Sequence, residues 1–171
     1  MKFDPFENQN SFYKYDLKIS EEEINQILIL VKSKKTLDQK TTFESLNVLN
    51  FPLLKNLRKQ VISILDEKKL ILRNNWAQLY NSKNFHCVHT HNNSDYSGII
   101  YIQGKTPTLF YDRNFIPYFE KFEKNTMLLF PSWIPHEVRP LQSDENRLII
   151  SFNSTSICTN ASDRVLYSNY G

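Results

Sequence analysis

Three histidines in this chain have the spacing of a metal centre. His89 and His91 flank Thr90, and His136 lies much further along, directly before Glu137. Alternate side chains of a β-strand share a face, so the imidazoles of His89 and His91 are expected to point the same way. Two histidines on one face and a third from a distant strand form a common site for iron, zinc or copper. The pattern therefore predicts a metal site made of His89, His91 and His136.

Arg147 is placed in the sequence so that its side chain could reach the predicted metal site. After His136 comes a polar segment, residues 142–146, and Arg147 then opens the apolar run Leu148–Phe152. Strands joined by a turn lie side by side in an antiparallel sheet, so His136 and Arg147 can reach one cavity. A guanidinium stays charged when it is buried and binds a carboxylate through two parallel N–H groups. We expect Arg147 to hold a carboxylate close to the metal. Arg139, three residues after His136 and expected on the same strand, is the second candidate, and its side chain could face substrate or solvent.

The elements that must position these residues are helices followed by short strands. Ser11–Ile19 are expected to form a first extended piece. Ser20 and Glu23 then form a capping box, and apolar residues at helical spacing come after it. A second helix is expected to start near Pro52, a residue tolerated in a first helical turn. Beyond it, turn residues separate short apolar runs, which are expected to be the strands Leu70–Leu72, Trp76–Tyr80, Cys87–His91, Gly98–Ile102, Thr108–Tyr111, Met127–Phe130, His136–Arg139 and Leu148–Phe152.

This order of elements predicts a mainly β fold with N-terminal helices, namely a jelly-roll or cupin-like barrel with two helices packed outside. The length of 171 residues fits a single domain over residues 1–171. We expect a helical part to about residue 68, a jelly-roll core over about 69–153, and a tail over 154–171.

Composition narrows the class of protein. Hydrophobic residues make up 40% of the chain, which indicates a globular protein rather than a disordered one. The net charge is only +3, and no basic stripe with interleaved aromatic residues indicates nucleic-acid binding. No apolar run is long enough to cross a membrane. The two cysteines, Cys87 and Cys158, form no CxxC pattern, so a reduced, cytoplasmic setting is expected.

Four blocks of sequence carry a family resemblance, and together they span Trp76 to Asn153. They are His89-Thr90-His91, Ser97-Gly98-Ile99-Ile100-Tyr101, Phe130–Pro140 and Arg147–Asn153. With these blocks the chain resembles the Fe(II)- and 2-oxoglutarate-dependent oxygenases of the double-stranded β-helix fold, and most of all their short members from bacteria and marine phages. The block Phe130–Pro140 is also similar to prolyl 4-hydroxylase-type domains.

The resemblance implies an enzyme with Fe(II), 2-oxoglutarate as cosubstrate and O2. It implies hydroxylation of a substrate such as a peptidyl or free amino-acid side chain, with release of succinate and CO2. In such an enzyme Arg147 would hold the far carboxylate of 2-oxoglutarate. Tyr101 would either contact the cosubstrate or only pack in the core, and Tyr80 is a weaker candidate for the same role. The setting would be the cytoplasm, or the host cytoplasm for a phage-encoded chain.

The chain departs from the usual iron site of these enzymes. That site has two histidines and a carboxylate, with the carboxylate two residues after the first histidine. Here the corresponding position is His91. Two ligand sets stay open: His89, His91 and His136, which we favour, or Asp95 with His136 and one histidine of the pair. In the first set Asp95 would only support a ligand.

Two further interpretations stay open. A cupin that is not an oxygenase of this kind, such as an isomerase, a dioxygenase without 2-oxoglutarate or a small-molecule sensor, uses three histidines and a carboxylate in a similar order. A jelly-roll without metal is also possible, but it gives the three histidines no role. Arg147 separates the first two classes, because a cupin has no need of an arginine at this position.

Overall fold

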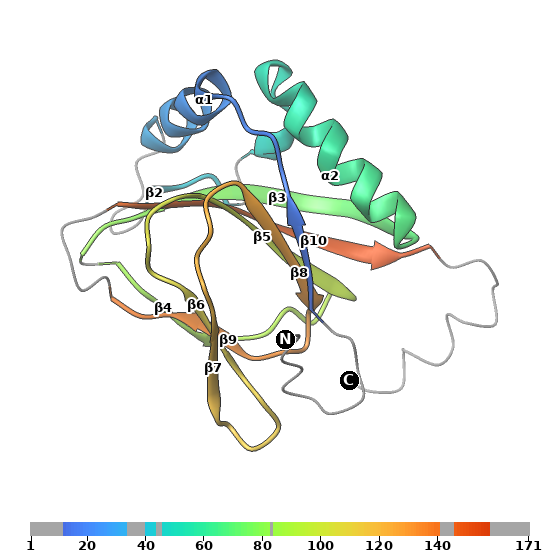
Figure 1. Cartoon of the computed structure of the whole chain (residues 1–171), viewed down its shortest axis with the longest axis vertical. Helices are drawn as coiled ribbons and strands as arrows, with labels where there is room; N and C mark the ends of the chain where they lie inside the picture. The colour runs from blue at the N-terminus through green and yellow to red at the C-terminus, as the bar shows by residue number, and fades with distance from the viewer. Residues whose placement is uncertain (1–11, 34–39, 44–45, 83, 141–145, 158–171) are drawn as a thin grey trace.

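Two antiparallel β-sheets face each other, and two helices cover the outer side of one of them (Figure 1). The computed structural model describes residues 12–33, 40–43, 46–82, 84–140 and 146–157. The helices are α1 (Glu21–Lys32) and α2 (Lys55–Glu67), with two short 3-10 helices, η1 (Val48–Asn50) and η2 (Pro52–Leu54), before α2. The strands are β1 (Tyr13–Asp16), β2 (Lys40–Thr41), β3 (Leu70–Tyr80), β4 (His86–His89), β5 (Tyr96–Gln103), β6 (Thr108–Tyr111), β7 (Pro117–Glu120), β8 (Thr126–Pro131), β9 (His136–Val138) and β10 (Arg147–Ser156).

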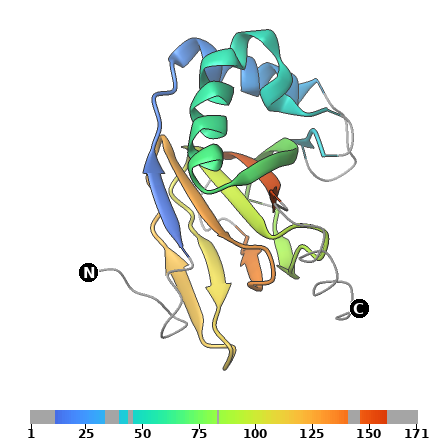
Figure 2. The same ribbon diagram turned by 90° about the vertical axis from the view of Figure 1, so that its right-hand side faces the viewer.

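The larger sheet has the strand order β1-β8-β5-β10-β3-β2, and the smaller has the order β4-β9-β6-β7. All strand pairs in both sheets are antiparallel. Apart from the hairpin of β6 and β7, neighbours in each sheet are far apart in sequence, as in a jelly-roll, where the chain passes repeatedly from one sheet to the other. Figure 2 shows α1 and α2 packed together at one end of the molecule, away from the smaller sheet.

Alternation along the central strands gives the larger sheet two different faces. On β10, Leu148, Ile150 and Phe152 pack with the helices in one apolar core. Ile149 points to the other side and joins a second core, which lies between the two sheets. Because side chains alternate along a strand, the odd-numbered positions of β10 face the smaller sheet. Arg147, the first residue of β10, stands at one of these positions.

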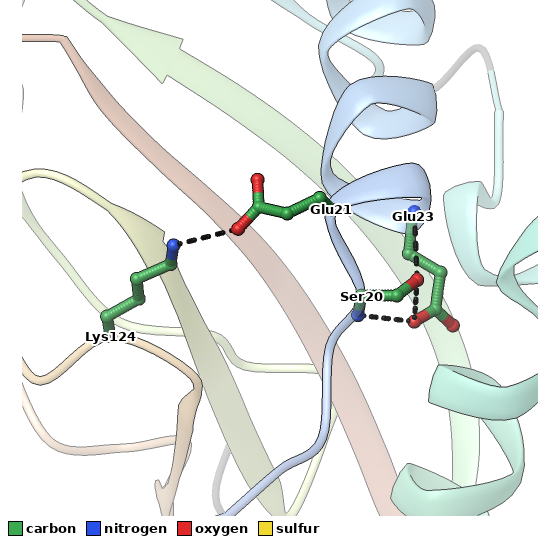
Figure 3. Close-up of polar contacts among 4 residues, drawn as sticks. All are labelled: Ser20, Glu21, Glu23 and Lys124. Atoms are coloured by element: carbon green, nitrogen blue, oxygen red, sulfur yellow. Dashed lines mark hydrogen bonds and ion pairs between the residues drawn. The ribbon is translucent and has the colours of Figure 1, made fainter.

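The capping box predicted at residue 20 is present. Ser20 is the N-cap of α1: the Glu23 amide donates to its hydroxyl, and its own amide donates to the Glu23 carboxylate at 2.9 Å (Figure 3). The same carboxylate also accepts from the Leu57 amide of α2 at 3.1 Å. Glu23 is therefore buried without being unpaired, and it ties the two helices together. Glu21 forms an exposed ion pair with Lys124, also drawn in Figure 3.

Several boundaries differ from those expected from the sequence. The two strands predicted on either side of Arg73 are one strand, β3, because Asn75 is used inside the sheet: its carboxamide accepts from the Leu49 amide at 2.7 Å. The helix expected near Pro52 starts as η2 and becomes α2 only at Lys55.

The sequence missed two short strands and the end of a third. Strands β2 and β7 were not predicted, and β7 begins with Pro117 at the edge of the smaller sheet, where proline is tolerated. Strand β10 continues to Ser156, and the part of the predicted tail after Ile157 lies outside the described residues. Within the described part of the chain, no helix is long and apolar enough to cross a membrane.

Candidate metal and cosubstrate site

The three histidines singled out from the sequence meet in the structure. Each offers a ring nitrogen, and these atoms all lie within 4.8 Å of one another. His89 ends β4 and is directly opposite His136, which begins β9. His91 comes just after β4, and its amide donates to the Ser132 carbonyl at 2.9 Å, which ties it to the turn before β9. Pairing between β4 and β9 therefore brings together residues that are far apart in sequence.

Backbone carbonyls orient two of the three rings. The Nδ1 atom of His136 lies 2.9 Å from the Ile134 carbonyl, and the Nδ1 atom of His89 lies 2.8 Å from the Cys87 carbonyl. A carbonyl can only accept, so in each ring Nδ1 carries the hydrogen and Nε2 keeps its lone pair. This is the usual way in which proteins fix a ligating histidine.

Burial keeps the three imidazoles neutral. It lowers the pKa of His136 to about 3 and the pKa of His91 to about 4, and it also lowers the pKa of His89. The neighbouring histidines lower each of these pKa values further, because positive charges so close together repel. Neutral imidazole is the form that binds metals. The donor set is thus ready to take a divalent cation at neutral pH.

The structure does not bring Asp95 into this cluster. Its carboxylate accepts from the Ser156 amide at 2.6 Å, its amide donates to the Ser154 carbonyl at 3.0 Å, and its carbonyl accepts from the Ser132 amide at 2.9 Å. Asp95 thus joins the segment after His91 to β10 and to the turn before β9. His86 also lies outside the cluster, although its ring centre is only 4.0 Å from that of His89.

Arg147 is completely buried at the start of β10. Its Nε donates to the Thr106 carbonyl at 3.0 Å, and its Nη2 donates to the Thr108 hydroxyl at 2.8 Å. Its Nη1 is buried and has no hydrogen-bond partner among the described residues. A buried guanidinium nitrogen without a partner is costly, and a carboxylate ligand would satisfy it.

Two tyrosines flank this guanidinium. Its carbon lies 5.1 Å from the centre of the Tyr80 ring and 5.8 Å from that of Tyr101. The Tyr101 hydroxyl donates to the Thr108 hydroxyl at 3.2 Å, the same group that binds Arg147. Burial raises the pKa of Tyr80, and the charge of Arg147 opposes that rise. Tyr80 lines the cavity, whereas Tyr101 is outside its lining and reaches it through Thr108.

One cavity of about 590 Å³ joins the two parts of the site. The three histidines, Arg147 and Tyr80 all line it. Sequence reasoning missed several other lining residues, and four of these matter below: Trp76, Gln78, Thr108 and Asn153. The period-two alternation on β3 and β10 could have found three of them, since Trp76 and Gln78 alternate with Tyr80, and Asn153 is six positions after Arg147. Arg139 is exposed, bonds to Glu137 at 2.9 Å, and does not line this cavity.

Comparisons with known proteins agree with this geometry. Residues 107–153, which hold His136 and Arg147, match the family model described as "Putative 2OG-Fe(II) oxygenase". No curated protein matches the chain.

Solved structures share the fold at low sequence identity. The viral collagen prolyl hydroxylase vCPH from Paramecium Bursaria Chlorella virus-1, in its 2-oxoglutarate complex, is 12% identical, with a TM-score of 0.65 over 86% of this chain and 97% of that one. A prolyl hydroxylase from Trichoplax adhaerens is 15% identical, with a TM-score of 0.66 over 93% and 88%. HygX from Streptomyces hygroscopicus, with nickel and 2-oxoglutarate bound, is 11% identical, with a TM-score of 0.63 over 86% and 83%.

These likenesses confirm the predicted double-stranded β-helix with helices outside. The family match implies Fe(II) and 2-oxoglutarate, and both parts of the donor set fit them: three neutral imidazoles for the metal, and an unpartnered guanidinium nitrogen for the carboxylate. The match over residues 107–153, together with the fold and the histidine cluster, shows that this part of the chain is similar to the 2OG-Fe(II) oxygenases.

Proposed function

We propose that this protein is an Fe(II)- and 2-oxoglutarate-dependent oxygenase, a hydroxylase that binds Fe(II) through His89, His91 and His136 and 2-oxoglutarate through Arg147. The observation that carries the proposal is the unpartnered Nη1 of Arg147, a residue that lines the same cavity as the histidines. A cupin without 2-oxoglutarate would have no use for a fully buried cation there. A dicarboxylate that chelates the metal at one end and meets Arg147 at the other accounts for both groups.

The bound metal and cosubstrate supply the oxidative chemistry, in which O2 and 2-oxoglutarate are consumed, succinate and CO2 are released and a C–H bond of the substrate becomes C–OH. The protein holds and orients the reactants. The carbonyls of Ile134 and Cys87 fix the rings of His136 and His89. Thr108 fixes the guanidinium of Arg147, and Tyr80 covers its face.

Three histidines leave the metal with no anionic protein ligand. The position of the usual carboxylate belongs to His91, and Asp95 bonds elsewhere. We therefore propose that Asp95 supports the segment after His91 and does not bind the metal. The charge of the bound dianionic cosubstrate would then balance the divalent metal directly.

We further propose that the substrate is a peptidyl or free amino-acid side chain. The support is the likeness to the prolyl hydroxylases of the Chlorella virus and of Trichoplax, the second of which was solved with a peptide fragment of a hypoxia inducible factor. We place the reaction in the cytoplasm, where Fe(II) and 2-oxoglutarate are available and the exposed Cys87 would stay reduced.

Calorimetric titration under anaerobic conditions tests this function. The metal-free protein is loaded with Co(II) or Fe(II) and titrated with 2-oxoglutarate. We expect one metal per chain and one 2-oxoglutarate per metal, with no 2-oxoglutarate binding before metal is added. In air, the Fe(II) form should release succinate slowly without added substrate. Metal binding without any 2-oxoglutarate binding would overturn the proposal and favour the cupin alternative.

A further inference from the structure

The cavity has two chemically different ends. Arg147 and Tyr80, which are opposite each other on β10 and β3, form one end. Further along the same two strands, the lining changes to amides, hydroxyls and an indole: Gln78, Trp76, Ser151 and Asn153. Among the described lining residues, Arg147 is the only one with a permanent charge. With 2-oxoglutarate at the Arg147 end, the neutral end is left for the second reactant.

Serine hydroxyls hold the oxygen atoms of two carboxamides at this end. Ser151 donates to Oε1 of Gln78 at 3.3 Å, and Ser97 donates to Oδ1 of Asn153 at 2.9 Å. Each oxygen is thereby engaged inside the protein. The NH2 group of each carboxamide has no acceptor among the described residues, and both residues line the cavity. The groups that Gln78 and Asn153 offer to a ligand are therefore N–H donors.

A series of hydrogen-bonded hydroxyls leads to Asn153. Ser94 donates to Ser132 at 2.8 Å, and Ser132 lies 2.8 Å from Ser97, which donates to Asn153. Each hydroxyl has a single hydrogen. Since Ser97 gives its hydrogen to Asn153, Ser132 must give its own to Ser97. The bonds as assigned run from Ser94 through Ser132 and Ser97 to the carboxamide oxygen of Asn153, which leaves the NH2 of Asn153 outside this series.

Trp76 lies beside these donors and next to the metal cluster. Its ring centre is 6.2 Å from that of His91, and it packs edge-on against Phe43 at 4.9 Å. The indole is almost wholly buried, and the phenyl ring braces it. It gives an apolar wall near the reacting centre, against which an aliphatic side chain can pack.

We propose that Gln78 and Asn153 form a subsite for the main-chain carbonyl oxygens of a peptide, with Trp76 as the wall beside the residue that reacts. The inference rests on the proposed function and selects one of its two substrate classes. A free amino acid carries a carboxylate and an ammonium group, which need counter-charges that the described lining does not provide at this end. A residue within a peptide replaces both charges by neutral amides, and amide donors pair well with amide carbonyls.

The test uses a random hexapeptide library, acetylated and amidated at its ends, against a mixture of the twenty free amino acids. Binding is measured by saturation-transfer NMR on the anaerobic Zn(II) and 2-oxoglutarate complex, and function by 2-oxoglutarate consumption of the Fe(II) form in air. We expect library peptides to bind and to raise 2-oxoglutarate consumption about tenfold or more, because bound substrate couples the cosubstrate to chemistry. The free amino acids should do neither.

Two isosteric variants remove the NH2 groups of Gln78 and Asn153 and keep the oxygen atoms that accept from Ser151 and Ser97. Gln78→Glu and Asn153→Asp each place a carboxylate oxygen, in place of an N–H donor, opposite a peptide carbonyl oxygen. Each variant should therefore reduce the peptide-dependent part of the 2-oxoglutarate consumption about tenfold or more, mainly by raising KM. The affinity for 2-oxoglutarate should stay within about twofold, which also shows that the variants fold. Asn50→Asp makes the same exchange at an exposed position of η1 and should behave as the wild type.

The outcomes separate the two proposals. If the wild type does not bind 2-oxoglutarate, the proposed function fails. If it binds 2-oxoglutarate but the library neither binds nor stimulates, or the free amino acids stimulate as well as the library, the peptide subsite is wrong. Full peptide-dependent activity in both Gln78→Glu and Asn153→Asp would equally overturn it.

Discussion

Arg147 and Tyr80 are direct partners across β10 and β3, and the guanidinium carbon of Arg147 lies 5.1 Å from the centre of the Tyr80 ring. The ring shields one face of a cation that is completely buried. Thr106 and Thr108 bind two of its nitrogens from the side of β6. The third nitrogen is left for a ligand, so the first prediction concerns this arginine.

Replacing Arg147 should separate cosubstrate binding from metal binding. Removal of one partner of a buried charge pair typically costs about 3–5 kcal/mol. Arg147→Ala should therefore weaken 2-oxoglutarate binding by roughly two to three orders of magnitude, while Arg147→Lys should recover part of the loss, because it keeps the charge but not the planar fork. Metal stoichiometry should not change. Anaerobic calorimetry of the metal-loaded variants measures this, and wild-type affinity in Arg147→Ala would exclude the assigned role.

Loss of His136 should abolish metal binding. His136 is buried at the centre of the cluster, and two imidazoles alone rarely hold Fe(II). The measurement is the metal content of His136→Ala after equilibration with Fe(II) or Co(II) and gel filtration. His86→Ala is the matched control, because His86 lines the same cavity but lies outside the cluster. One metal per chain in His136→Ala would contradict the assignment of this ligand.

Asp95 should matter for metal affinity only indirectly. Asp95→Ala removes the acceptor of the Ser156 amide and loosens the segment that carries His91. Loss of such a supporting group typically costs about 10–100-fold in metal affinity. Competition titration with a chromogenic chelator measures the change. Complete loss of metal with an unchanged circular dichroism spectrum would instead make Asp95 a direct ligand.

The metal-free protein should lose stability in mild acid. Burial sets the pKa of His136 at about 3 and that of His91 at about 4, both below the ordinary value of 6.5. Between these values the unfolded chain binds protons that the folded chain does not, so stability is fully present above pH 6.5 and is lost as the pH falls toward the folded pKa values. The melting temperature should fall from about pH 7 to about pH 5, and His136→Gln should flatten that dependence. An equally steep profile in the variant would exclude His136 as the cause.

Gly98 should tolerate no side chain. A Cβ built on Gly98 would lie 2.0 Å from Cζ of Phe152, its neighbour across β5 and β10. Phe152 is fully buried and belongs to the core under the helices, so moving its ring would disturb that core. Gly98→Ala should therefore destabilise the fold by about 1–3 kcal/mol, as overpacking does. Urea denaturation measures this cost, and Phe152→Leu in the same chain should restore part of the loss.

Short-range patterns in the sequence were enough to predict the start of the first helix, the start of the last strand and the pairing of two histidines. The capping box at Ser20, the alternation that places Arg147 at the start of a strand, and the shared face of His89 and His91 are all short-range features. The roles of these residues in catalysis and in metal and cosubstrate binding remain predictions.

Other features of the molecule depend on hydrogen bonds between residues that are far apart in the sequence. These features could not be predicted from the sequence alone. Asn75 looked like a turn residue, but it completes β3 because Leu49 donates to its carboxamide. Nothing in the sequence around Thr108 predicts a role in the site. Its hydroxyl accepts hydrogen bonds from Arg147 and Tyr101 only because β6 lies beside them in the fold. The engagement of Asp95 with Ser156 likewise depends on where β10 runs.

The alternation along the first part of β10 also limits how this chain can vary in length. Deleting one residue after Arg147 would move every later side chain to the opposite face. Ile150 would then enter the cavity, and the polar side chain of Ser151 would be forced against the helices. Natural variants of this enzyme should therefore change β10 by substitution alone. Gains and losses of residues are expected instead in exposed connections such as residues 112–116, between β6 and β7, where no face has to be preserved.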